Sequence, residues 1–306
     1  MSSLDFVAYK GKKKIAEVQA IPDLQGAPLI ETHAHLDMLE DPSLALARAA
    51  VVGISTVLTL TNLVEGAQAT YEMLDVWREG AQNILDNAHV GPAVHLPDTY
   101  IITGVHPHNA RLWTEAVEAD LRRFAKDPRT VGIGEAGLDY YYDHSPREVQ
   151  REVFARKLEL ASELDLPVVV HLRDAHEDGL RIMQEVGVPA AGAILHCFNK
   201  DLELAQPFID LGCNLGFGGP VTFKNATDVK TAARNAPTGR FVVETDCPFM
   251  APQPFRGQKC EPAHTLWVAQ EVARLREVTL PVLARETTAT ARSIFKLPVA
   301  VDADAA

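Results

Sequence analysis

Residues 29–37 have the sequence Leu29-Ile30-Glu31-Thr32-His33-Ala34-His35-Leu36-Asp37, in which an apolar start leads into two histidines two positions apart. A β-strand turns successive side chains to opposite faces, so His33 and His35 point toward the same place. One metal ion can take a nitrogen from each. The same pair also fits two hydrogen-bonded polar residues at the end of a strand. The other apolar runs of the chain decide between these two interpretations.

Seven further runs rich in apolar and β-branched residues follow, and segments with helical periodicity separate them. The eight predicted strands cover residues 28–33, 54–61, 100–105, 130–135, 167–171, 193–196, 213–217 and 240–244. The predicted helices cover residues 43–52, 64–86, 110–126, 146–164, 177–186, 202–211, 225–235, 262–276 and 281–295. Eight strand and helix units in about 250 residues favour an α/β fold of the (β/α)8 TIM-barrel type. An open doubly wound sheet is disfavoured because no Gly-x-Gly-x-x-Gly follows the first strand.

We expect a single barrel domain over residues 28–297, with an N-terminal arm at 1–27 and a disordered tail at 298–306. No linker rich in glycine, serine or proline divides the chain, and no period of about 20 to 50 residues repeats. The connection over residues 63–98 is long for one unit. It predicts a helix followed by an irregular loop.

The composition limits the partners of the chain. A formal net charge of −12 over 306 residues repels a polyanion at long range and disfavours an extensive basic face for nucleic acid. A local basic pocket or a bound metal ion remains compatible with this charge. The four cysteines show no Cys-x-x-Cys spacing, and no apolar run approaches the roughly 20 residues of a membrane span. These features predict a cytoplasmic protein without a membrane partner, and none of them identifies a protein partner.

The active site of a (β/α)8 barrel lies at the carboxyl ends of its strands. Residues that bind metals or protons follow six of the predicted strands: His33 and His35, His106 and His108, Glu135, His171, His196, and Glu244 with Asp246. Burying four histidines and two carboxylates without partners at one barrel mouth costs several kcal/mol, whereas a divalent cation satisfies them. The strand ends therefore predict a metal centre.

The spacing of these residues predicts two cations with a shared carboxylate between them. The first group is His33, His35 and Asp246, the second is His171 and His196, and Glu135 bridges them. Nitrogen and oxygen donors without thiolate suit Zn, Mn, Mg, Ni or Fe, so the element stays open. A water shared by two ions has its pKa lowered toward about 7 and becomes a nucleophile. Asp246, able to take and return its proton, and the bridging Glu135 are the predicted catalytic residues.

The motifs that carry these residues resemble those of TatD-type metal-dependent hydrolases of the amidohydrolase superfamily. The matching segments occur in order over roughly residues 29–295. They are Glu31-Thr32-His33-Ala34-His35-Leu36-Asp37, Gly104-Val105-His106-Pro107-His108, Gly132-Ile133-Gly134-Glu135-Ala136-Gly137-Leu138-Asp139-Tyr140, His171-Leu172-Arg173-Asp174-Ala175, His196-Cys197-Phe198, Gly219-Pro220-Val221-Thr222-Phe223-Lys224-Asn225, Glu244-Thr245-Asp246-Cys247-Pro248, and Arg256-Gly257 with Glu261-Pro262.

The resemblance implies a TIM barrel with two divalent ions and hydrolase activity, which for several members is cleavage of DNA phosphodiesters. It also implies that His33, His35, Glu135 and Asp246 form one metal site. The other site would consist of Glu135, His171 and His196. The N-terminal arm and the long 63–98 segment depart from the family pattern, and both bear on access to the site.

Four further residues are candidates for substrate binding, each with a structural alternative. His106 either contacts a substrate phosphate or orients Glu135. Arg173 lies two positions after His171 and either binds a phosphate oxygen or pairs with a carboxylate. Lys224 and Arg256 lie in the loops after the seventh and eighth strands, where barrels often bind phosphate. Tyr140, Tyr141 and Tyr142 either stack on a base or pack with hydrogen-bonded hydroxyls.

Three functions fit these observations. The first is a two-metal phosphodiesterase acting on DNA. The second is a hydrolase of a small amide, ester or lactone on the same fold. The third, a barrel that has lost catalysis, is disfavoured because every ligand position is filled.

Overall fold

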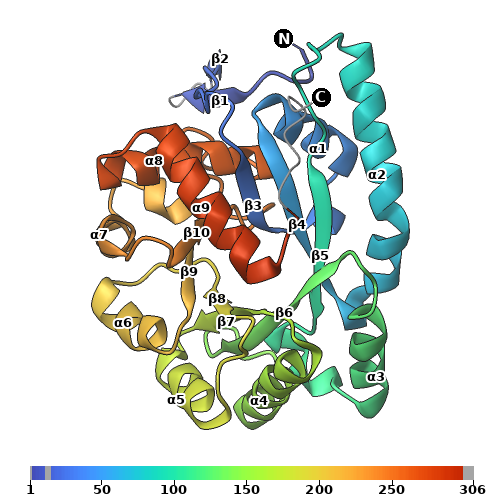
Figure 1. Cartoon of the computed structure of the whole chain (residues 1–306), viewed down its shortest axis with the longest axis vertical. Coiled ribbons are helices and arrows are strands. Elements are labelled where there is room, and N and C mark those ends of the chain that lie inside the picture. Colours follow the sequence, from blue (N-terminus) through green and yellow to red (C-terminus); the bar gives the residue numbers. More distant parts are fainter. Residues whose placement is uncertain (1, 11–14, 299–306) are drawn as a thin grey trace.

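The computed structural model describes residues 2–10 and 15–298, and a parallel eight-stranded sheet forms its centre (Figure 1). The strands are β3 (Leu29–Ala34), β4 (Ile54–Asn62), β5 (Asp98–Gly104), β6 (Thr130–Asp139), β7 (Val168–Arg173), β8 (Ala193–Leu195), β9 (Asn214–Phe217) and β10 (Phe241–Val243). Each strand pairs with the next one along the chain. The predicted strands are confirmed, with one notable difference at β6. This strand continues to Asp139 rather than ending at residue 135.

Contacts between β3 and the segment after β10 bring the two edges of the sheet together. Ala34 forms a parallel bridge with Cys247, whose carbonyl accepts a hydrogen bond from the backbone N–H of His35 at 2.9 Å. The backbone N–H of Asp246 donates to the His33 carbonyl at 2.9 Å. The sheet is therefore a nearly closed barrel, which confirms the predicted TIM-barrel fold.

The helices surround this barrel (Figure 1). They are α1 (Pro42–Val51), α2 (Ala67–Asn87), α3 (Glu115–Phe124), α4 (Arg147–Leu164), α5 (His176–Val186), α6 (Leu202–Asp210), α7 (Thr227–Asn235), α8 (Thr265–Arg276) and α9 (Leu280–Phe295). Short 3₁₀ helices lie at Leu36–Met38, Leu63–Glu65, Pro107–Leu112, Gly219–Thr222 and Pro262–His264. Local signals set several helix ends. The Asp41 side chain, for example, caps α1 by accepting a hydrogen bond from the Leu44 N–H at 2.9 Å.

The long connection contains a helix followed by an irregular loop, as predicted. α2 begins at Ala67 rather than at residue 64, because Gly66 has a φ of 100° and a right-handed helix cannot pass through that conformation. Residues 88–97 then run without helix or strand to β5.

Two apolar layers stabilise the barrel. The larger core lies between the sheet and the helices. The smaller one fills the barrel interior, where Ile102, Val169 and Val242 meet Ile294 and Phe295 of α9. The last helix thus closes the barrel at the amino ends of its strands, where Thr288 donates to the Pro28 carbonyl, and leaves the carboxyl ends open.

The arm before the barrel contains a two-stranded antiparallel sheet that the sequence did not indicate. β1 (Val7–Lys10) pairs with β2 (Ile15–Val18), and both lie at the top of Figure 1. Phe6 precedes β1 and is 1% exposed. Its ring lies 5.1 Å from that of Trp267, and the Arg48 guanidinium lies over it. A buried aromatic anchor therefore holds the arm to the barrel.

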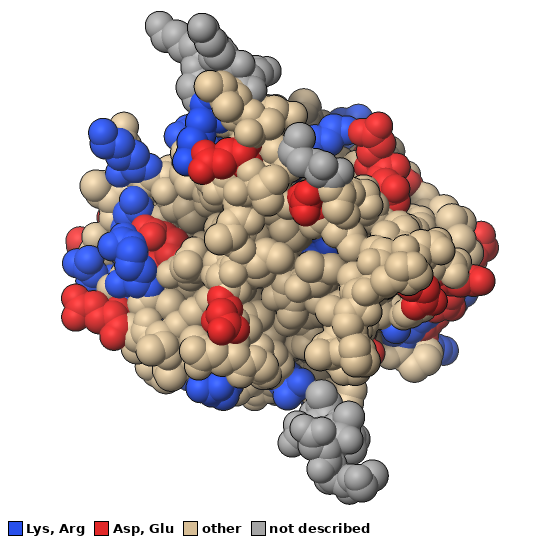
Figure 2. Space-filling view, turned by 90° about the horizontal axis from the view of Figure 1, so that it is seen from above, with Lys and Arg blue, Asp and Glu red and all other residues tan. Residues whose placement is uncertain are grey.

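Charged side chains of both signs are interspersed around the edge of the face shown in Figure 2, whose centre carries few charges. This face has no continuous basic surface, in keeping with the net charge of −12. No described helix combines the length and apolar character needed to cross a bilayer. The predicted tail at 298–306 falls outside the described residues except for Pro298.

Candidate metal centre

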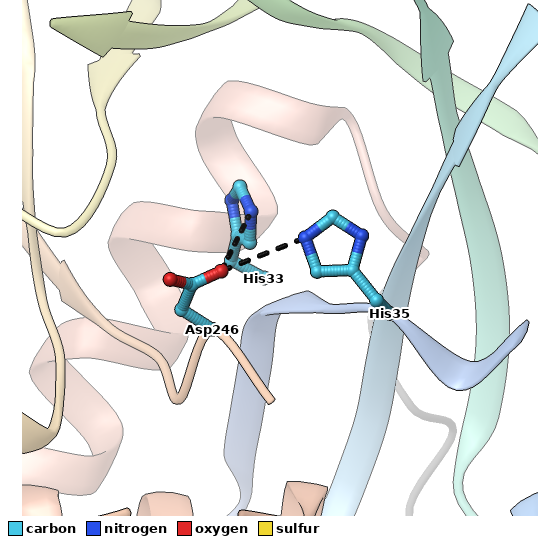
Figure 3. Close-up of side chains that lie close together, drawn as sticks. All are labelled: His33, His35 and Asp246. Atoms are coloured by element: carbon cyan, nitrogen blue, oxygen red, sulfur yellow. Dashed lines mark ion pairs between the residues drawn. The ribbon is translucent and has the colours of Figure 1, made fainter. Parts of the chain in front are cut away.

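His33 lies in β3 and His35 directly follows that strand. Both rings converge on Asp246, which follows β10 (Figure 3). The Oδ1 atom of Asp246 lies 3.6 Å from Nε2 of His33 and 3.5 Å from Nε2 of His35. The strand alternation predicted that the two rings share a side, and closure of the barrel beside β3 brings the carboxylate to them. These three residues could hold one metal ion.

Glu135 of β6 lies between this group and a second one. Its Oε1 atom is 3.5 Å from Nε2 of His35 and 3.9 Å from Nε2 of His33. Its Oε2 atom is 2.9 Å from Nε2 of His196 and 3.3 Å from Nδ1 of His171. Each oxygen of one carboxylate thus faces a different pair of histidines, in the arrangement that a bridging ligand requires.

The second pair comes from neighbouring strands. His171 lies in β7 and His196 directly follows β8, and their facing nitrogens are 3.0 Å apart. His33 stacks on His196 with ring centroids 4.0 Å apart. All six predicted ligands therefore lie in one cluster at the carboxyl ends of the strands.

Asp139 is a site residue that the sequence analysis did not single out. Its Oδ2 atom lies 3.1 Å from Nε2 of His171 and 2.9 Å from Nε2 of His108. Gln150 of α4 hydrogen-bonds the Asp139 backbone at both its N–H and its carbonyl. A signal was present, since residues 135, 137 and 139 share one face of a strand. It was missed because the predicted strand ended at residue 135.

The electrostatics of the cluster favour an ionised carboxylate and divide the imidazoles, because neighbouring carboxylates outweigh burial and raise the pKa of His35 and of His171 to about 9, whereas burial lowers the pKa of His33. Burial opposes ionisation of Glu135, but the imidazoles of His106, His196 and His171 hold its pKa well below the usual range. Burial, together with neighbouring His196, holds the pKa of His33 well below its usual value. The neutral form of His33 is favoured, and it keeps the lone pair of one ring nitrogen available for a metal.

The donors present fit a divalent cation. His33 is fully buried, yet neither of its ring nitrogens has a hydrogen-bond partner among the described residues. An unpaired buried polar atom costs about 1–3 kcal/mol, and coordination removes that cost. Groups of three donors recur here, with ligand atoms within 4.8 Å of one another. Imidazole and carboxylate donors are the usual ligands of zinc, manganese and nickel.

Two buried residues outside the ligand set support the site from below. The Nζ atom of Lys157 in α4 donates to the carbonyl of Val105 at 2.5 Å and to that of Glu135 at 2.9 Å. The carboxylate of Glu31 accepts hydrogen bonds from the His33 N–H at 2.8 Å and the Thr245 N–H at 3.1 Å. Lys157 thus ties the backbone of Glu135 to the segment that follows β5, and Glu31 ties β3 to the segment that carries Asp246.

The structure separates the four substrate-binding candidates into two sets. Nε2 of His106 lies 3.7 Å from Oε2 of Glu135, so His106 belongs to the cluster. Arg173 lines a cavity that also contains His171 and His196. Lys224 and Arg256 do not line that cavity, and the Arg256 guanidinium lies over the ring of Phe223. A role in substrate binding stays a prediction for all four residues.

The sequence of the chain matches a known protein family. The family model described as "TatD related DNase" matches residues 30–296. The chain belongs to the TatD family. The curated relatives that it resembles include metal-dependent hydrolases described as uncharacterized: YabD of Bacillus subtilis and YcfH of Escherichia coli K12. This TatD-family chain is accordingly a metal-dependent hydrolase.

The relatives cover most of the barrel. YabD is 42% identical over 198 residues, which cover 65% of this chain and 78% of YabD. YcfH is 36% identical over 276 residues, which cover 88% of this chain and 96% of YcfH. A protein of Erwinia billingiae described as "3'-5' ssDNA/RNA exonuclease TatD" is 35% identical over 200 residues, covering 64% of this chain and 77% of that protein.

The solved structure of the TatD homologue YJJV from Escherichia coli K12 shares the fold. It superposes with a TM-score of 0.77 at 24% identity, and the match covers 88% of this chain and 98% of YJJV. The hairpin of β1 and β2 precedes the part of the chain that the family model matches. It is an addition to the barrel that the TatD family shares.

Proposed function

We propose that this TatD-family hydrolase cleaves DNA phosphodiester bonds with two divalent cations held at the barrel mouth. The observation that carries the proposal is the position of Glu135, whose two oxygens face separate pairs of histidines. The proposed ligands of the first cation are His33, His35, Glu135 and Asp246, and those of the second are Glu135, His171 and His196. Zn, Mn, Mg and Ni are all compatible with these donors.

The residues of this chain have distinct roles in the proposed reaction. Bound divalent cations supply positive charge that polarises a phosphoryl oxygen and lowers the pKa of a nearby water toward about 7. Asp246 is 9% exposed, and we assign it the transfer of the proton of the attacking water. Glu135 stays ionised and balances the positive charge of the site. Asp139 orients His171 through the hydrogen bond to its Nε2 atom.

Two observations favour a phosphodiester over a small amide, ester or lactone. The exposed guanidinium of Arg173 lines the cavity beside His171, where a phosphate oxygen finds a suitable donor. The Erwinia relative is described as a nuclease that acts on single-stranded DNA and RNA.

The test is an assay of the purified chain with Mg, Mn or Zn against single-stranded DNA, duplex DNA and a phosphodiester reporter. Small carboxylic esters and lactones form the second set of substrates. We expect cleavage of DNA, and a loss of about a thousandfold or more in Asp246→Asn and His171→Ala. His89→Asn, which changes an exposed histidine in the irregular segment after α2 and suits its φ of 51°, should retain wild-type activity.

Hydrolysis of esters or lactones without cleavage of any phosphodiester would replace this proposal by the small-molecule alternative. Activity that survives both Asp246→Asn and His171→Ala would remove the cluster from the mechanism.

A further inference from the structure

A cavity of about 360 Å³ extends from the metal centre to one side of the barrel mouth. His171, His196 and Asp246 form its inner end. Its outer part includes Tyr141, which follows β6, Arg173, which ends β7, and Lys200, which follows β8. Known small-molecule sites span roughly 300–1,000 Å³, so this cavity has room for one nucleotide rather than for several.

Arg173 lies over two tyrosine rings at the edge of this cavity, and because those rings are at 90° to each other its guanidinium can lie flat on only one of them. Its guanidinium carbon lies 4.1 Å from the ring centroid of Tyr141 and 4.7 Å from that of Tyr142. Among residues 2–10 and 15–298, its side chain has no hydrogen-bond or ion-pair partner. The carboxylate pairing that the sequence left open for Arg173 is therefore absent there. A guanidinium held by two rings presents its plane and its N–H groups at low entropic cost, and nucleic-acid bases stack on such planes.

Lys200 adds a second positive charge to the same cavity. Its nearest described carboxylate is that of Asp174, with 4.0 Å between Nζ and Oδ1. Both side chains are about half exposed, so this pairing is weak and leaves the ammonium group available. Two cations against the single carboxylate of Asp174 make the outer cavity locally positive on a chain whose net charge is −12.

We propose that this cavity is a subsite for the nucleotide that carries the scissile phosphate. The base stacks against Arg173 and Tyr141, and Lys200 binds the next phosphate along the strand. This inference rests on the proposed phosphodiesterase function. It adds a ligand class, a single nucleotide with phosphates on both sides, and two residues, Tyr141 and Lys200, that the hydrolase chemistry itself does not need.

The test uses three reporters that share one leaving group. They are bis(p-nitrophenyl) phosphate, a thymidine p-nitrophenyl phosphodiester, and the same thymidine ester with a phosphate on its other sugar oxygen. Each of the two thymidine reporters is made as two isomers, with the p-nitrophenyl phosphate at the 5′ or at the 3′ oxygen. Inorganic phosphate serves as a competitor, because inhibition by phosphate alone would report the metal centre rather than the subsite.

For the wild type we expect kcat/KM to rise about tenfold when the nucleoside is added and about tenfold again when the second phosphate is added. Tyr141→Leu should abolish the first increase, and Tyr141→Phe should restore it. Lys200→Met should abolish the second increase, and Lys200→Arg should restore it. These losses should appear in KM, with kcat within twofold of the wild type.

Lys230→Met is the matched control, because Lys230 has the same 4.0 Å separation from a carboxylate, that of Glu271, and does not line the cavity. It should keep both increases. Equal kcat/KM on all three reporters, or increases that survive Tyr141→Leu and Lys200→Met, would overturn the subsite while leaving the phosphodiesterase intact. Failure to cleave any reporter or DNA would overturn the proposed function, and the subsite with it.

Discussion

Glu135 offers an oxygen to both pairs of histidines, whereas the proposed assignment makes His33 a ligand of the first cation alone. Removing His33 takes one nitrogen from a group that includes His35 and Asp246. Removing Glu135 takes a carboxylate oxygen from both groups. The two substitutions should therefore differ in how many cations remain bound.

We expect His33→Ala to retain about one equivalent of metal and Glu135→Ala to retain much less than one. Both should lose activity by about a thousandfold or more, because the transition-state charge loses its stabilisation. Elemental analysis after dialysis measures the metal, and circular dichroism checks that the barrel is folded. Two equivalents of metal in Glu135→Ala would contradict a bridging role.

Lys157 illustrates how a buried amine outside the ligand set acts on the site, since burial lowers the pKa of this side chain to about 7. Its Nζ atom donates to the carbonyl of Val105, which precedes His106, and to the carbonyl of the bridging residue Glu135. We expect Lys157→Met to weaken metal binding by about tenfold to a hundredfold, the usual effect of removing a group that orients ligands. Metal titration by calorimetry measures this. Lys296→Met, which removes an exposed lysine paired with Asp165, is the control and should bind metal normally.

His264 predicts a pH dependence of stability that is separate from the metal centre. Burial, aided by the Arg48 guanidinium, lowers the pKa of His264 from 6.5 to about 3, and its ring stacks on that of Phe255. In the unfolded chain the His264 imidazole takes up a proton near pH 6.5, whereas in the folded chain it stays neutral until the pH approaches about 3. Above pH 6.5 His264 therefore has no effect on the free energy of unfolding. As the pH falls from 6.5 toward 3, proton uptake by the unfolded chain lowers that free energy progressively.

Between pH 7.5 and 5.5 the wild type should lose about 1.4 kcal/mol more unfolding free energy than His264→Gln, from one pH unit of linkage. Urea unfolding at the two pH values measures the difference. An equal loss in both proteins would show that His264 is protonated in the folded state.

Among the elements, β6 carries the most of the site, because Glu135 and Asp139 both lie on it. Between them, Gly137 has a φ of 145°, and a Cβ atom there would lie 1.9 Å from the His171 carbonyl oxygen. Only glycine allows β6 and β7 to approach this closely.

We expect Gly137→Ala to destabilise the fold by about 3 kcal/mol and to reduce activity sharply, because β6 must move away from β7. Thermal unfolding and the phosphodiester assay measure the two effects. Gly91→Ala is the control, since a Cβ atom there meets nothing within 4 Å. A Gly137→Ala protein with wild-type activity would show that the spacing of the two strands does not set the site.

For the molecule as a whole, we expect the N-terminal arm to stabilise the barrel through Phe6. Phe6 packs on Trp267 and Phe255 and is 1% exposed, whereas Tyr9 of β1 is 53% exposed. We expect Phe6→Ala to cost about 3–5 kcal/mol of unfolding free energy and Tyr9→Ala less than about 0.5 kcal/mol. Urea unfolding measures both. Reporter kcat and KM should be unchanged in each folded variant, and a raised KM in Phe6→Ala would instead connect the arm to the site.

Much of the fold and of the candidate site was predictable from local patterns. Each apolar run of the barrel is short and each helix has its own periodicity, so the order of strands and helices follows from neighbouring residues. The rule that active sites lie at the carboxyl ends of barrel strands then selected His33, Glu135 and His171 without any knowledge of distances. The structure places these residues together because every strand of the barrel points the same way.

Other features depended on contacts between distant segments, which no local pattern encodes. Asp139 at the end of β6 contacts His108, which follows the neighbouring strand β5. The side chain of Lys157 in α4 reaches Val105, which lies 52 positions earlier in the chain. The hairpin of β1 and β2 is held through Phe6 by Trp267 of α8, near the other end of the chain. The alternating strands thus specify the barrel and its ring of ligands, because they act through backbone periodicity. The orientation of those ligands, the cavity beside them and the docking of the arm arise from side-chain packing, which exists only once the barrel has closed.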